Sequence, residues 1–387
     1  MKVLFIMRYW PVYGGGETVS ATLANEFINL GIDVHCAYKY FNSVEPMPYQ
    51  LNPCIKTVNI HTIEKYEKKD ITTLHNYIKK NDIDVMINQW GNITLCSEAV
   101  KGTKCKLIHC CHTSVIMKVD QPNGWKQKLL YNLTSRDLYE KIMIRNQIRN
   151  LKKNYELCDK YIFLSKSFAE EFLSLTKIID RKNKVGFISN PLTFDNFFDC
   201  NKDFDRKRKN VLFVGRIFEY PKRLSLILKI WKKIESDSSC NDWALTIVGD
   251  GDDLEKTKEL SNNLELKRIS FEGFKAPKPF YEQASIFLMT SSCEGFGMTL
   301  VEAQQHAVVP IAMDSYSSLH DIIENGKNGI IVKDGDIAEF CKSLKNIMFD
   351  DMLRYSIARQ GVEDCKRFSI KKIKDQWMKT FWDLTNE

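Results

Sequence analysis

The feature that most constrains the fold is a repeated alternation of short apolar runs with helical segments. In the first half of the chain, six runs have strand character: 2–7, 33–38, 84–88, 106–111, 161–164 and 185–188. Between the first two runs, residues 18–30 carry apolar side chains at helical spacing and end at Gly31, a typical position for a helix-terminating glycine. Because parallel strands need a crossover connection, this order predicts a parallel sheet.

The alternation is interrupted once, at Asn190-Pro191-Leu192, and the charged segment 194–210 that follows has no clear periodicity. It then restarts, with strands predicted at 211–214, 244–248, 269–272, 286–289, 308–312 and 329–332, and helices at 225–235, 254–262, 298–306 and 336–349. We therefore expect an α/β protein of two Rossmann-like, doubly wound domains facing a cleft. The predicted domains are 1–190 and 191–368, and a final helix, 369–387, is expected to cross back to the first domain through Trp377, Phe381 and Leu384.

Composition excludes several classes of protein. The twelve cysteines of the 387 residues are scattered without CxxC spacing, and no apolar run approaches the ~18 residues of a membrane span. The chain starts with Met-Lys and a strand-like run, which is unlike a signal peptide. We expect a cytoplasmic protein with reduced thiols. Peripheral attachment to the inner face of the membrane is a further option.

Positive charge is concentrated in residues 126–153, which hold eight bases and two acids. Apolar residues interleave with these bases: Tyr131, Leu133, Leu138, Ile142, Met143 and Ile148. One interpretation is a helix lying on an anionic membrane surface, and the other is a solvated helix face. Nucleic acid is a poorer partner, because no stacking platform or groove-reading motif accompanies the charge.

The stretch Ser291-Ser-Cys-Glu-Gly-Phe-Gly-Met-Thr-Leu-Val-Glu-Ala303 joins a predicted strand to a predicted helix through a glycine turn. Free N–H groups and the positive helix end at such a turn favour a phosphate. Glu294, in the loop, and Glu302, in the second helical turn, can accept hydrogen bonds from hydroxyls. Together these features indicate a nucleotide sugar. The alternative is a capping acid and a solvated helix glutamate.

Two other glycine turns follow predicted first strands. Gly14-Gly15-Gly16-Glu17 allows a ligand to approach the backbone closely, although it lacks dinucleotide-binding spacing. Gly215-Arg216, followed by Lys222, supplies cations suited to a diphosphate leaving group. The alternatives are a plain tight turn and surface bases beside Pro221.

Two segments resemble metal sites, and we predict that neither holds a metal. Consecutive residues of a strand point to opposite faces, so His109-Cys110-Cys111-His112 cannot converge on one ion. Gly249-Asp250-Gly251-Asp252-Asp253 lies between a strand and a helix, which favours a turn with helix-capping acids. His112 lies at a strand end, where a neutral imidazole can donate to a substrate hydroxyl or carbonyl.

The segment Glu294-Gly-Phe-Gly-Met-Thr-Leu-Val-Glu302 resembles the Glu-x7-Glu signature of retaining family-4 glycosyltransferases of the GT-B fold. Other segments match that family's order, so that the resemblance covers nearly the whole chain: Gly14 to Glu17, Ser189 to Pro191, Gly215-Arg216 with Lys222, Val248 to Gly251, Phe271 to Phe274 and Asn325 to Gly329. One departure is that the family often has Lys-Gly where this chain has Lys222-Arg223, which adds a further candidate cation.

The resemblance implies roles for individual residues. Glu302 would accept from the ribose hydroxyls and Glu294 from the hydroxyls of the donor sugar. Arg216 and Lys222 would neutralise the diphosphate, and His112 would lie near the donor sugar. The remaining donor contacts implied are the backbone N–H groups of Phe296, Gly297 and Met298 for sugar and phosphate, Thr299 and Leu300 for the distal phosphate, and Gly15 and Gly16 at the acceptor-side loop. The family needs no metal and no cofactor.

The sequence therefore predicts a retaining hexosyltransferase that uses a nucleotide sugar, expected to be UDP-linked. The acceptor would be a glycan or a lipid-linked saccharide in surface polysaccharide or glycoconjugate synthesis. Two alternatives stay open on the same fold: a nucleotide-sugar epimerase, and a non-catalytic subunit that binds a nucleotide sugar. A pyridoxal-dependent phosphorylase is disfavoured, because the chain is short and no Schiff-base lysine motif stands out.

Overall fold

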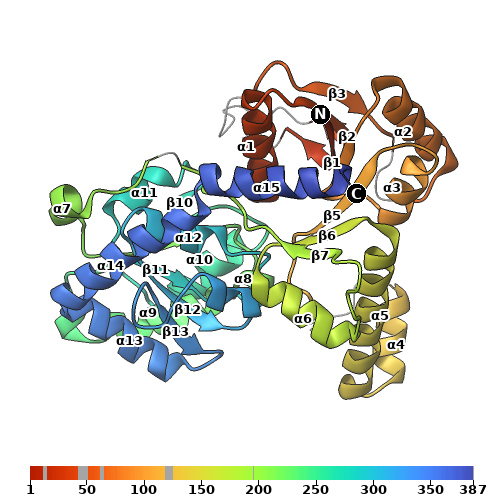
Figure 1. The fold of residues 1–387 in the computed structure, drawn as a ribbon. Helices are drawn as coiled ribbons and strands as arrows, with labels where there is room; N and C mark the ends of the chain where they lie inside the picture. Colours follow the sequence, from red (N-terminus) through yellow and green to blue (C-terminus); the bar gives the residue numbers. More distant parts are fainter. Residues whose placement is uncertain (12–14, 42–50, 62–64, 118–124, 195, 387) are drawn as a thin grey trace. The chain divides into compact units, whose positions relative to one another are not determined.

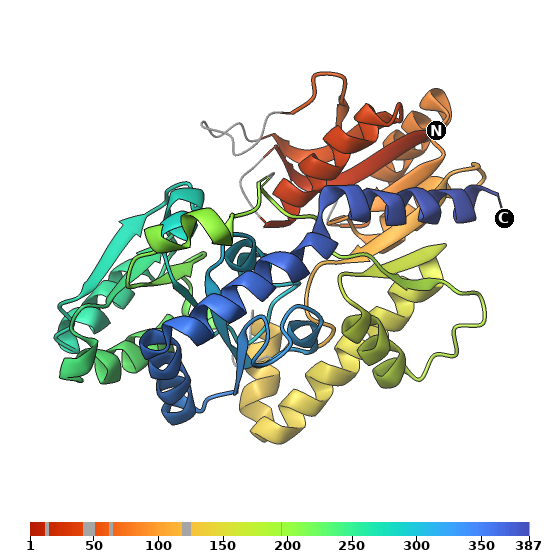
Figure 2. The same ribbon diagram turned by 60° about the vertical axis from the view of Figure 1, so that its left-hand side comes forward.

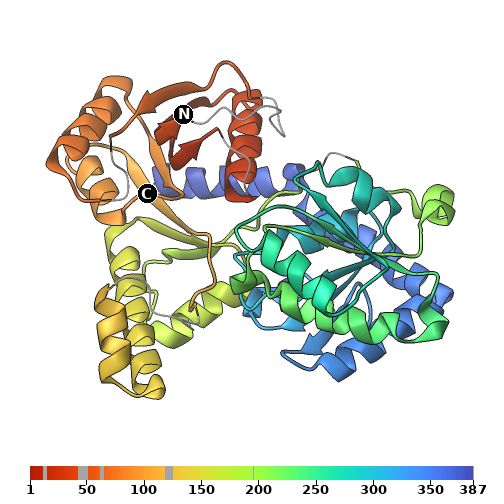
Figure 3. The same ribbon diagram turned by 180° about the vertical axis from the view of Figure 1, so that it is seen from behind.

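The structure, a computed structural model, describes residues 1–386 apart from 12–14, 42–50, 62–64, 118–124 and 195. It divides into two compact units. Unit 1 comprises Met1–Thr193 together with Ile370–Glu387, and unit 2 comprises Phe194–Ser369. Each unit holds one parallel sheet with helices on both faces (Figures 1 and 3), so the predicted pair of doubly wound α/β domains is confirmed.

Unit 1 contains a seven-stranded sheet in the order β3-β2-β1-β4-β5-β6-β7. The strands are β1 Lys2–Trp10, β2 Asp33–Phe41, β3 Lys56–Asn59, β4 Val85–Asn88, β5 Lys106–Cys111, β6 Lys160–Phe163 and β7 Val185–Phe187. The sequence analysis did not predict β3, whose four residues are mostly exposed at the sheet edge and carry no apolar run. The central strands are buried on both faces, as parallel strands covered by helices must be.

The helices of unit 1 are α1 Gly15–Asn29, α2 Lys68–Asn81, α3 Ile93–Val100, α4 Trp125–Leu133, α5 Arg136–Leu157, α6 Lys166–Thr176 and α15 Ile370–Thr385. Three of them start at a side chain that accepts a hydrogen bond from a first-turn N–H. Asn92 caps α3, Ser135 caps α5 and Ser165 caps α6. These caps are local signals that could have located helices our periodicity reading left out.

Unit 2 contains a six-stranded sheet in the order β10-β9-β8-β11-β12-β13. The strands are β8 Asn210–Val214, β9 Ala244–Val248, β10 Ile269–Gly273, β11 Ile286–Met289, β12 Val309–Asp314 and β13 Ile330–Lys333, all of which were predicted within two residues. The helices are α7 Cys200–Asp203, α8 Glu219–Lys222, α9 Leu224–Glu235, α10 Leu254–Asn263, α11 Lys278–Gln283, α12 Met298–Gln305, α13 Ile337–Phe349 and α14 Asp351–Cys365.

The last helix, α15, packs against α1 within unit 1 (Figures 1 and 2). Its predicted stripe of Trp377, Phe381 and Leu384 is buried, and the ring of Phe381 meets that of Phe27 edge-on at 5.3 Å. Lys374 of α15 also forms an ion pair with Glu26 of α1. The chain therefore leaves unit 1 at Thr193 and returns to it at Ile370.

Two further observations concern the whole chain. All twelve cysteines are free thiols, as expected. Within the described ranges, none of the helices combines the length and the apolar character that a bilayer crossing requires.

Candidate active site

In unit 2, the candidate donor site lies at the carboxyl end of β11, where the chain turns into α12. Gly297 adopts a φ of 93°, which side-chain-bearing residues rarely do, and a Cβ there would lie 2.8 Å from Tyr316 Oη. The turn places Glu294 in the loop and Glu302 in the helix, as predicted. A glycine is required at this point both for the conformation and for the close approach of Tyr316.

The first turn of α12 presents backbone N–H groups, and the structure separates those that have acceptors from those that do not. The N–H of Leu300 donates to the carbonyl of Gly297 at 2.9 Å, so it is already used within the turn. The N–H groups of Met298 and Thr299 stand before it, where a helix offers no acceptor of its own. The ring of Phe296 is buried and meets Phe368 edge-on at 5.3 Å, so its side chain anchors the turn.

Glu302 is buried, with a relative exposure of 8%. Its Oε2 accepts a hydrogen bond of 3.0 Å from the hydroxyl of Tyr281, which is itself fully buried in α11. Burial, and after it the neighbouring Glu302, raise the pKa of Tyr281 well above its usual value, so the phenol stays protonated and donates. Tyr281 thus fixes the orientation of the carboxylate that we assigned to the ribose. The sequence analysis missed Tyr281, because nothing local marks it as a partner of a residue 21 positions later.

Glu294 forms an ion pair with Lys222, whose Nζ lies 2.6 Å from Glu294 Oε1. Both side chains are mostly buried, at 14% and 19% exposure. The acid assigned to the sugar and the cation assigned to the diphosphate are therefore already in contact. A substrate that binds here exchanges part of that contact for its own hydroxyl and phosphate oxygens.

The three candidate cations of this edge differ in their surroundings. Arg216 is exposed, and no side-chain partner of its guanidinium is recorded in the described part of the chain. Lys222 is paired with Glu294. Arg223 binds Asp334 and two backbone carbonyls, so it is occupied by the protein itself and is not available as a further phosphate ligand. The further candidate cation named from the sequence, Arg223, therefore bonds other parts of the protein.

The Gly249–Asp253 loop packs against the loop that carries Arg216. A Cβ on Gly249 would lie 1.8 Å from the carbonyl oxygen of Gly215, so only glycine fits there. The prediction that the acids of this loop cap a helix was wrong in detail. Asp253 makes no side-chain cap to α10; it accepts from the N–H of Glu219 at 2.9 Å and pairs with Lys256. The acid therefore fixes the loop of β8 instead of its own helix.

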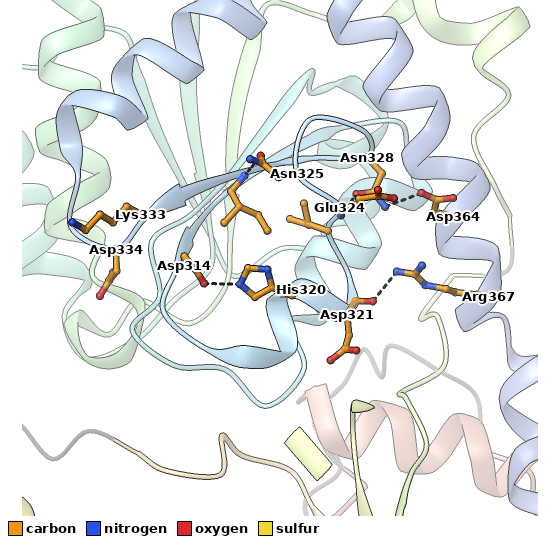
Figure 4. A pocket seen from close by; sticks show the side chains of 12 residues that line it. Asp314, His320, Asp321, Glu324, Asn325, Asn328, Lys333, Asp334, Asp364 and Arg367 are labelled. Carbon is orange, nitrogen blue, oxygen red and sulfur yellow. Dashed lines mark hydrogen bonds and ion pairs between the residues drawn. The ribbon is translucent and has the colours of Figure 1, made fainter. Parts of the chain in front are cut away.

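A cavity of about 1050 Å³ in unit 2 is lined mainly by the ends of β12 and β13 and by the segment between these strands (Figure 4). Its lining contains five carboxylates, from Asp314, Asp321, Glu324, Asp334 and Asp364. Figure 4 shows His320 turned toward Asp314, at 2.9 Å, and Arg367 turned toward the carbonyl of Asp321. Because an acidic lining repels a diphosphate, this cavity does not suit the nucleotide sugar that the sequence predicts.

In unit 1, Gly15 and Gly16 open α1 at the carboxyl end of β1, and Gly14 lies outside the described residues. A Cβ on Gly16 would lie 2.8 Å from Cζ2 of Trp90, whereas one on Gly15 would meet nothing within 4 Å. The packing of Trp90 is thus a sufficient reason for a glycine at position 16. Gly15 is the position with room for a ligand.

His112 follows β5, and its Nε2 faces Oε1 of Gln89. Because an amide oxygen only accepts, this assignment places the hydrogen on Nε2 and leaves Nδ1 as an acceptor. Burial lowers the pKa of His112 to about 3, so the ring is neutral. A free Nδ1 would accept from a substrate hydroxyl, which reverses the donor role that we predicted from the sequence.

The His112 ring stacks on Trp90, with centroids 4.9 Å apart. His112 Nδ1 and Trp90 Nε1 are both buried polar atoms without a partner among the described residues. The side chain of Asn88 bonds both the N–H and the carbonyl of Gly91, which fixes the backbone next to Trp90. Sequence reasoning missed Trp90 and Gln89, for which the position directly after a buried strand was the available signal.

The predicted absence of a metal at the two suspect segments can be compared with the geometry. Within the described ranges, the one group of three possible ligands whose atoms lie within 4.8 Å of one another is His61, Glu67 and Asp70. Neither the His109–His112 segment nor the Gly249–Asp253 loop contributes to it. The requirement for a metal in catalysis stays a prediction, as does the shared cleft between the two units.

Comparison with known proteins agrees with this description of both units. Residues 13–192 match the model of Glycosyltransferase Family 4, and residues 196–364 match that of Glycosyl transferases group 1. The chain is 25% identical, over 100% of its length and 99% of the relative's, to the GalNAc-α-(1→4)-GalNAc-α-(1→3)-diNAcBac-PP-undecaprenol α-1,4-N-acetyl-D-galactosaminyltransferase of Campylobacter jejuni. It is 24% identical to the lipopolysaccharide 1,6-galactosyltransferase of Salmonella typhimurium, over 90% of each chain.

Solved structures share the fold. HepE of Anabaena in complex with UDP superposes with a TM-score of 0.75 at 16% identity, covering 99% of this chain and 100% of that one. The pneumococcal O-GlcNAc transferase GtfA in complex with UDP and GlcNAc gives a TM-score of 0.74 at 12% identity, covering 100% and 99%.

Proposed function

This chain belongs to the group 1 glycosyltransferases of the GT-B fold, and from that premise we propose that it is a retaining hexosyltransferase. The donor is a UDP-linked sugar. The acceptor is a lipid-linked saccharide in surface polysaccharide synthesis. Two comparisons support these choices: HepE and GtfA are each seen with UDP, and the Campylobacter relative is named for an undecaprenol-linked acceptor.

The observation that carries the proposal is the contact between Lys222 and Glu294 beside the N-terminal turn of α12. In the proposed step, the bond between the anomeric carbon and the diphosphate oxygen breaks, and the acceptor oxygen bonds to the same face of that carbon. The acceptor proton passes to the departing diphosphate. Arg216, Lys222 and the N–H groups of Met298 and Thr299 stabilise the charge that the leaving group gains.

The same arrangement explains why we propose that no metal ion is needed. Cationic side chains and helix N–H groups supply the positive charge that a metal would otherwise bring to the diphosphate. Treatment of the purified enzyme with EDTA should leave the initial rate within about twofold, since no step of the proposed mechanism uses a metal. A loss that is restored by Mg²⁺ or Mn²⁺ would contradict this.

A donor screen tests the activity. Purified protein is incubated with UDP-, GDP- and ADP-sugars and a lipid-linked saccharide extract, and release of the nucleoside diphosphate is measured. We expect release with a UDP-sugar only when the acceptor is present, and a product whose anomeric configuration, read by NMR, equals that of the donor. Conversion of the donor without acceptor would indicate an epimerase, and nucleotide binding without release would indicate a non-catalytic subunit.

The site assignment predicts distinct effects for two variants. Glu302→Ala should weaken UDP binding by about 10- to 100-fold, because a hydrogen bond to a charged group contributes about 1.5–3 kcal/mol. Tyr281→Phe, which removes only the hydroxyl that orients Glu302, should weaken it by about tenfold at most. Calorimetry measures both affinities.

Tyr355→Phe is the matched control, because it also removes a phenol hydrogen bond in unit 2, to Asn201 at 3.3 Å. It should leave UDP affinity unchanged. Full affinity in Glu302→Ala would refute the ribose assignment. Arg216→Ala should instead lower turnover by about 100-fold, the usual cost of losing one transition-state charge contact.

A further inference from the structure

Arg223 has an unusual backbone conformation and a side chain that is mostly buried. It lies between α8 and α9 with a φ of 52°, in the left-handed region that favours glycine. Its side chain is only 21% exposed, although arginine is normally a surface residue. A non-glycine residue keeps this conformation only where surrounding contacts hold it. In Arg223, the contacts of the side chain can supply this restraint.

The guanidinium of Arg223 bonds two backbone carbonyls and a carboxylate from two other segments, and its Nη2 also lies 3.7 Å from Sδ of Met313. Its Nε donates to the carbonyl of Thr290 at 2.5 Å, and Nη2 donates to the carbonyl of Ser291 at 3.0 Å. Nη2 also bonds Oδ1 of Asp334 at 2.6 Å, which neutralises the charge. A planar guanidinium presents these donors in a fixed fork, whereas the donors of a lysine ammonium have no such fixed geometry.

The contacts run in both directions. Thr290 Oγ1 donates to the carbonyls of Lys222 and Arg223, at 3.0 and 3.1 Å. The N–H of Ser292 donates to the carbonyl of Pro221 at 2.8 Å. The segments 221–223 and 290–292 are thus joined by hydrogen bonds from each side. Lys222 lies in the first of these segments, and Glu294 lies two residues after the second. Their side chains meet at 2.6 Å.

We propose that Arg223 is a positioning residue, whose guanidinium, anchored by Asp334, fixes the β11–α12 loop against the β8 loop and so sets the separation of Lys222 and Glu294. Arg223 itself touches no substrate in this proposal. The inference rests on the proposed function in one respect: the cost to turnover follows only if Lys222 and Glu294 act on the donor. The structural part, that the guanidinium holds the loop, is independent of it.

The contact between Arg223 and Asp334 can also be changed from the side of Asp334. Asp334 is 27% exposed and lines the acidic cavity of Figure 4, so its carboxylate can be changed to an amide without filling a packed core. Asp334→Asn keeps the shape and removes the charge that anchors Nη2. It should therefore reproduce part of the effect of losing Arg223, and the double variant should be less than additive because both act through one contact.

The test uses the full chain with Arg223→Gly and Arg223→Lys. Glycine accepts the left-handed backbone without steric strain, so Arg223→Gly removes the side-chain contacts and leaves the backbone conformation allowed. Lysine keeps the charge but not the fixed fork geometry of the guanidinium. The matched control is Arg268→Lys, since Arg268 also bonds an amide oxygen and a backbone carbonyl in unit 2, at Asn241 and Glu235.

The first readout is amide hydrogen exchange in peptides that cover residues 290–297. We expect exchange there to rise on the order of tenfold in Arg223→Gly, with a smaller rise in Arg223→Lys and Asp334→Asn, while the strands of unit 2 keep their protection. Unchanged exchange in a folded Arg223→Gly protein overturns the proposal. Should that variant fail to fold, Arg223→Lys and Asp334→Asn carry the same comparison.

The second readout is the division between turnover and binding. Arg223→Gly should lower kcat by about 100-fold, the cost of a misplacement of about 1 Å, while UDP affinity changes by less than about threefold, because Glu302 and Tyr281 are untouched. Arg223→Lys should recover part of kcat. Faster exchange with full kcat would overturn the positioning role. If the wild-type chain transfers no sugar at all, the proposed function fails, and the exchange result still decides whether Arg223 holds the loop.

Discussion

At the scale of single residues, burial decides the protonation of several groups that the sequence leaves undetermined. Desolvation lowers the pKa of His109 and His306 to about 4 and that of His112 to about 3. Two of these, His109 and His112, lie in unit 1 around β5. Both are neutral at physiological pH, so His112 can accept a hydrogen bond through Nδ1, and His109 contributes a packed, neutral ring against Tyr161.

These lowered pKa values predict an acid-sensitive unit 1. In the unfolded chain histidine binds its proton near pH 6.5, and in the folded chain only near pH 3–4. The stability is therefore complete above pH 6.5 and falls as the pH drops toward 4, by about 1.4 kcal/mol per pH unit for each histidine. Urea unfolding of the full chain between pH 7 and 4.5, followed by hydrogen exchange in unit 1, measures this slope. His109→Gln should remove one histidine's share, and an unchanged slope would contradict the prediction.

At the scale of elements, the pair α4 and α5 presents the basic segment (Figure 2). The bases whose side chains the structure describes, from Lys128 to Lys153, are exposed. Of the six interleaved apolar residues, Leu133 and Leu138 are exposed, at 74% and 46%, while the others are half-buried. Leu129 and Ile144 add two exposed apolar side chains that we had not singled out. Apolar and basic groups on one helix pair favour our proposal of an anionic membrane surface over a merely solvated face.

Two bases of this segment are offset by acids on the same helix. Arg136 pairs with Glu140 and Lys141 pairs with Asp137, each four residues apart. A matched test therefore changes Arg145, Arg149 and Lys152 to glutamate. Co-flotation with anionic liposomes should fall by more than about tenfold, since each juxtamembrane base contributes about 1 kcal/mol.

The control for flotation changes Lys69, Lys79 and Lys80 of α2 to glutamate, which alters the net charge of unit 1 by the same amount. These three lysines are also exposed. The control should bind anionic liposomes as the unmodified chain does, and neither protein should bind neutral liposomes strongly. Equal losses in both variants would indicate a general charge effect and remove the assignment to α4 and α5.

At the scale of the whole molecule, the return of the chain to unit 1 packs α15 against α1, whose residues lie more than 300 positions earlier in the sequence. Phe381 is fully buried against Phe27 and Trp377. Phe381→Ala should destabilise unit 1 by about 3–5 kcal/mol, the usual cost of truncating a buried phenylalanine. Trp382→Ala, at a neighbouring position that is 67% exposed, is the control and should have little effect. Hydrogen exchange in α1 reports the difference, and similar values for the two variants would contradict the role of α15.

The agreement between sequence and structure is closest where local pattern and burial coincide. Every strand of unit 2 was predicted, and the signal was clearest where a parallel strand is covered on both faces and apolar throughout, as in Ile286–Met289. The edge strand Lys56–Asn59 was missed because its exposed residues carry no such signal. Helices α3 and α6 were passed over although Asn92 and Ser165 cap them.

The sequence alone determined the fold class and the turn between β11 and α12 with its two acids. These depend on the order of residues over ten or fifteen positions, where glycine, strand and helix preferences act. The partners of those acids were decided only by the tertiary structure. Tyr281 beside Glu302, Lys222 beside Glu294 and the Arg223 fork beside Asp334 join separate elements of unit 2: α11 with α12, α8 with the β11–α12 loop, and the residue after α8 with the residue after β13. Whether a charged side chain binds a substrate or another residue of the protein depends on these tertiary contacts, and no local sequence pattern encodes them.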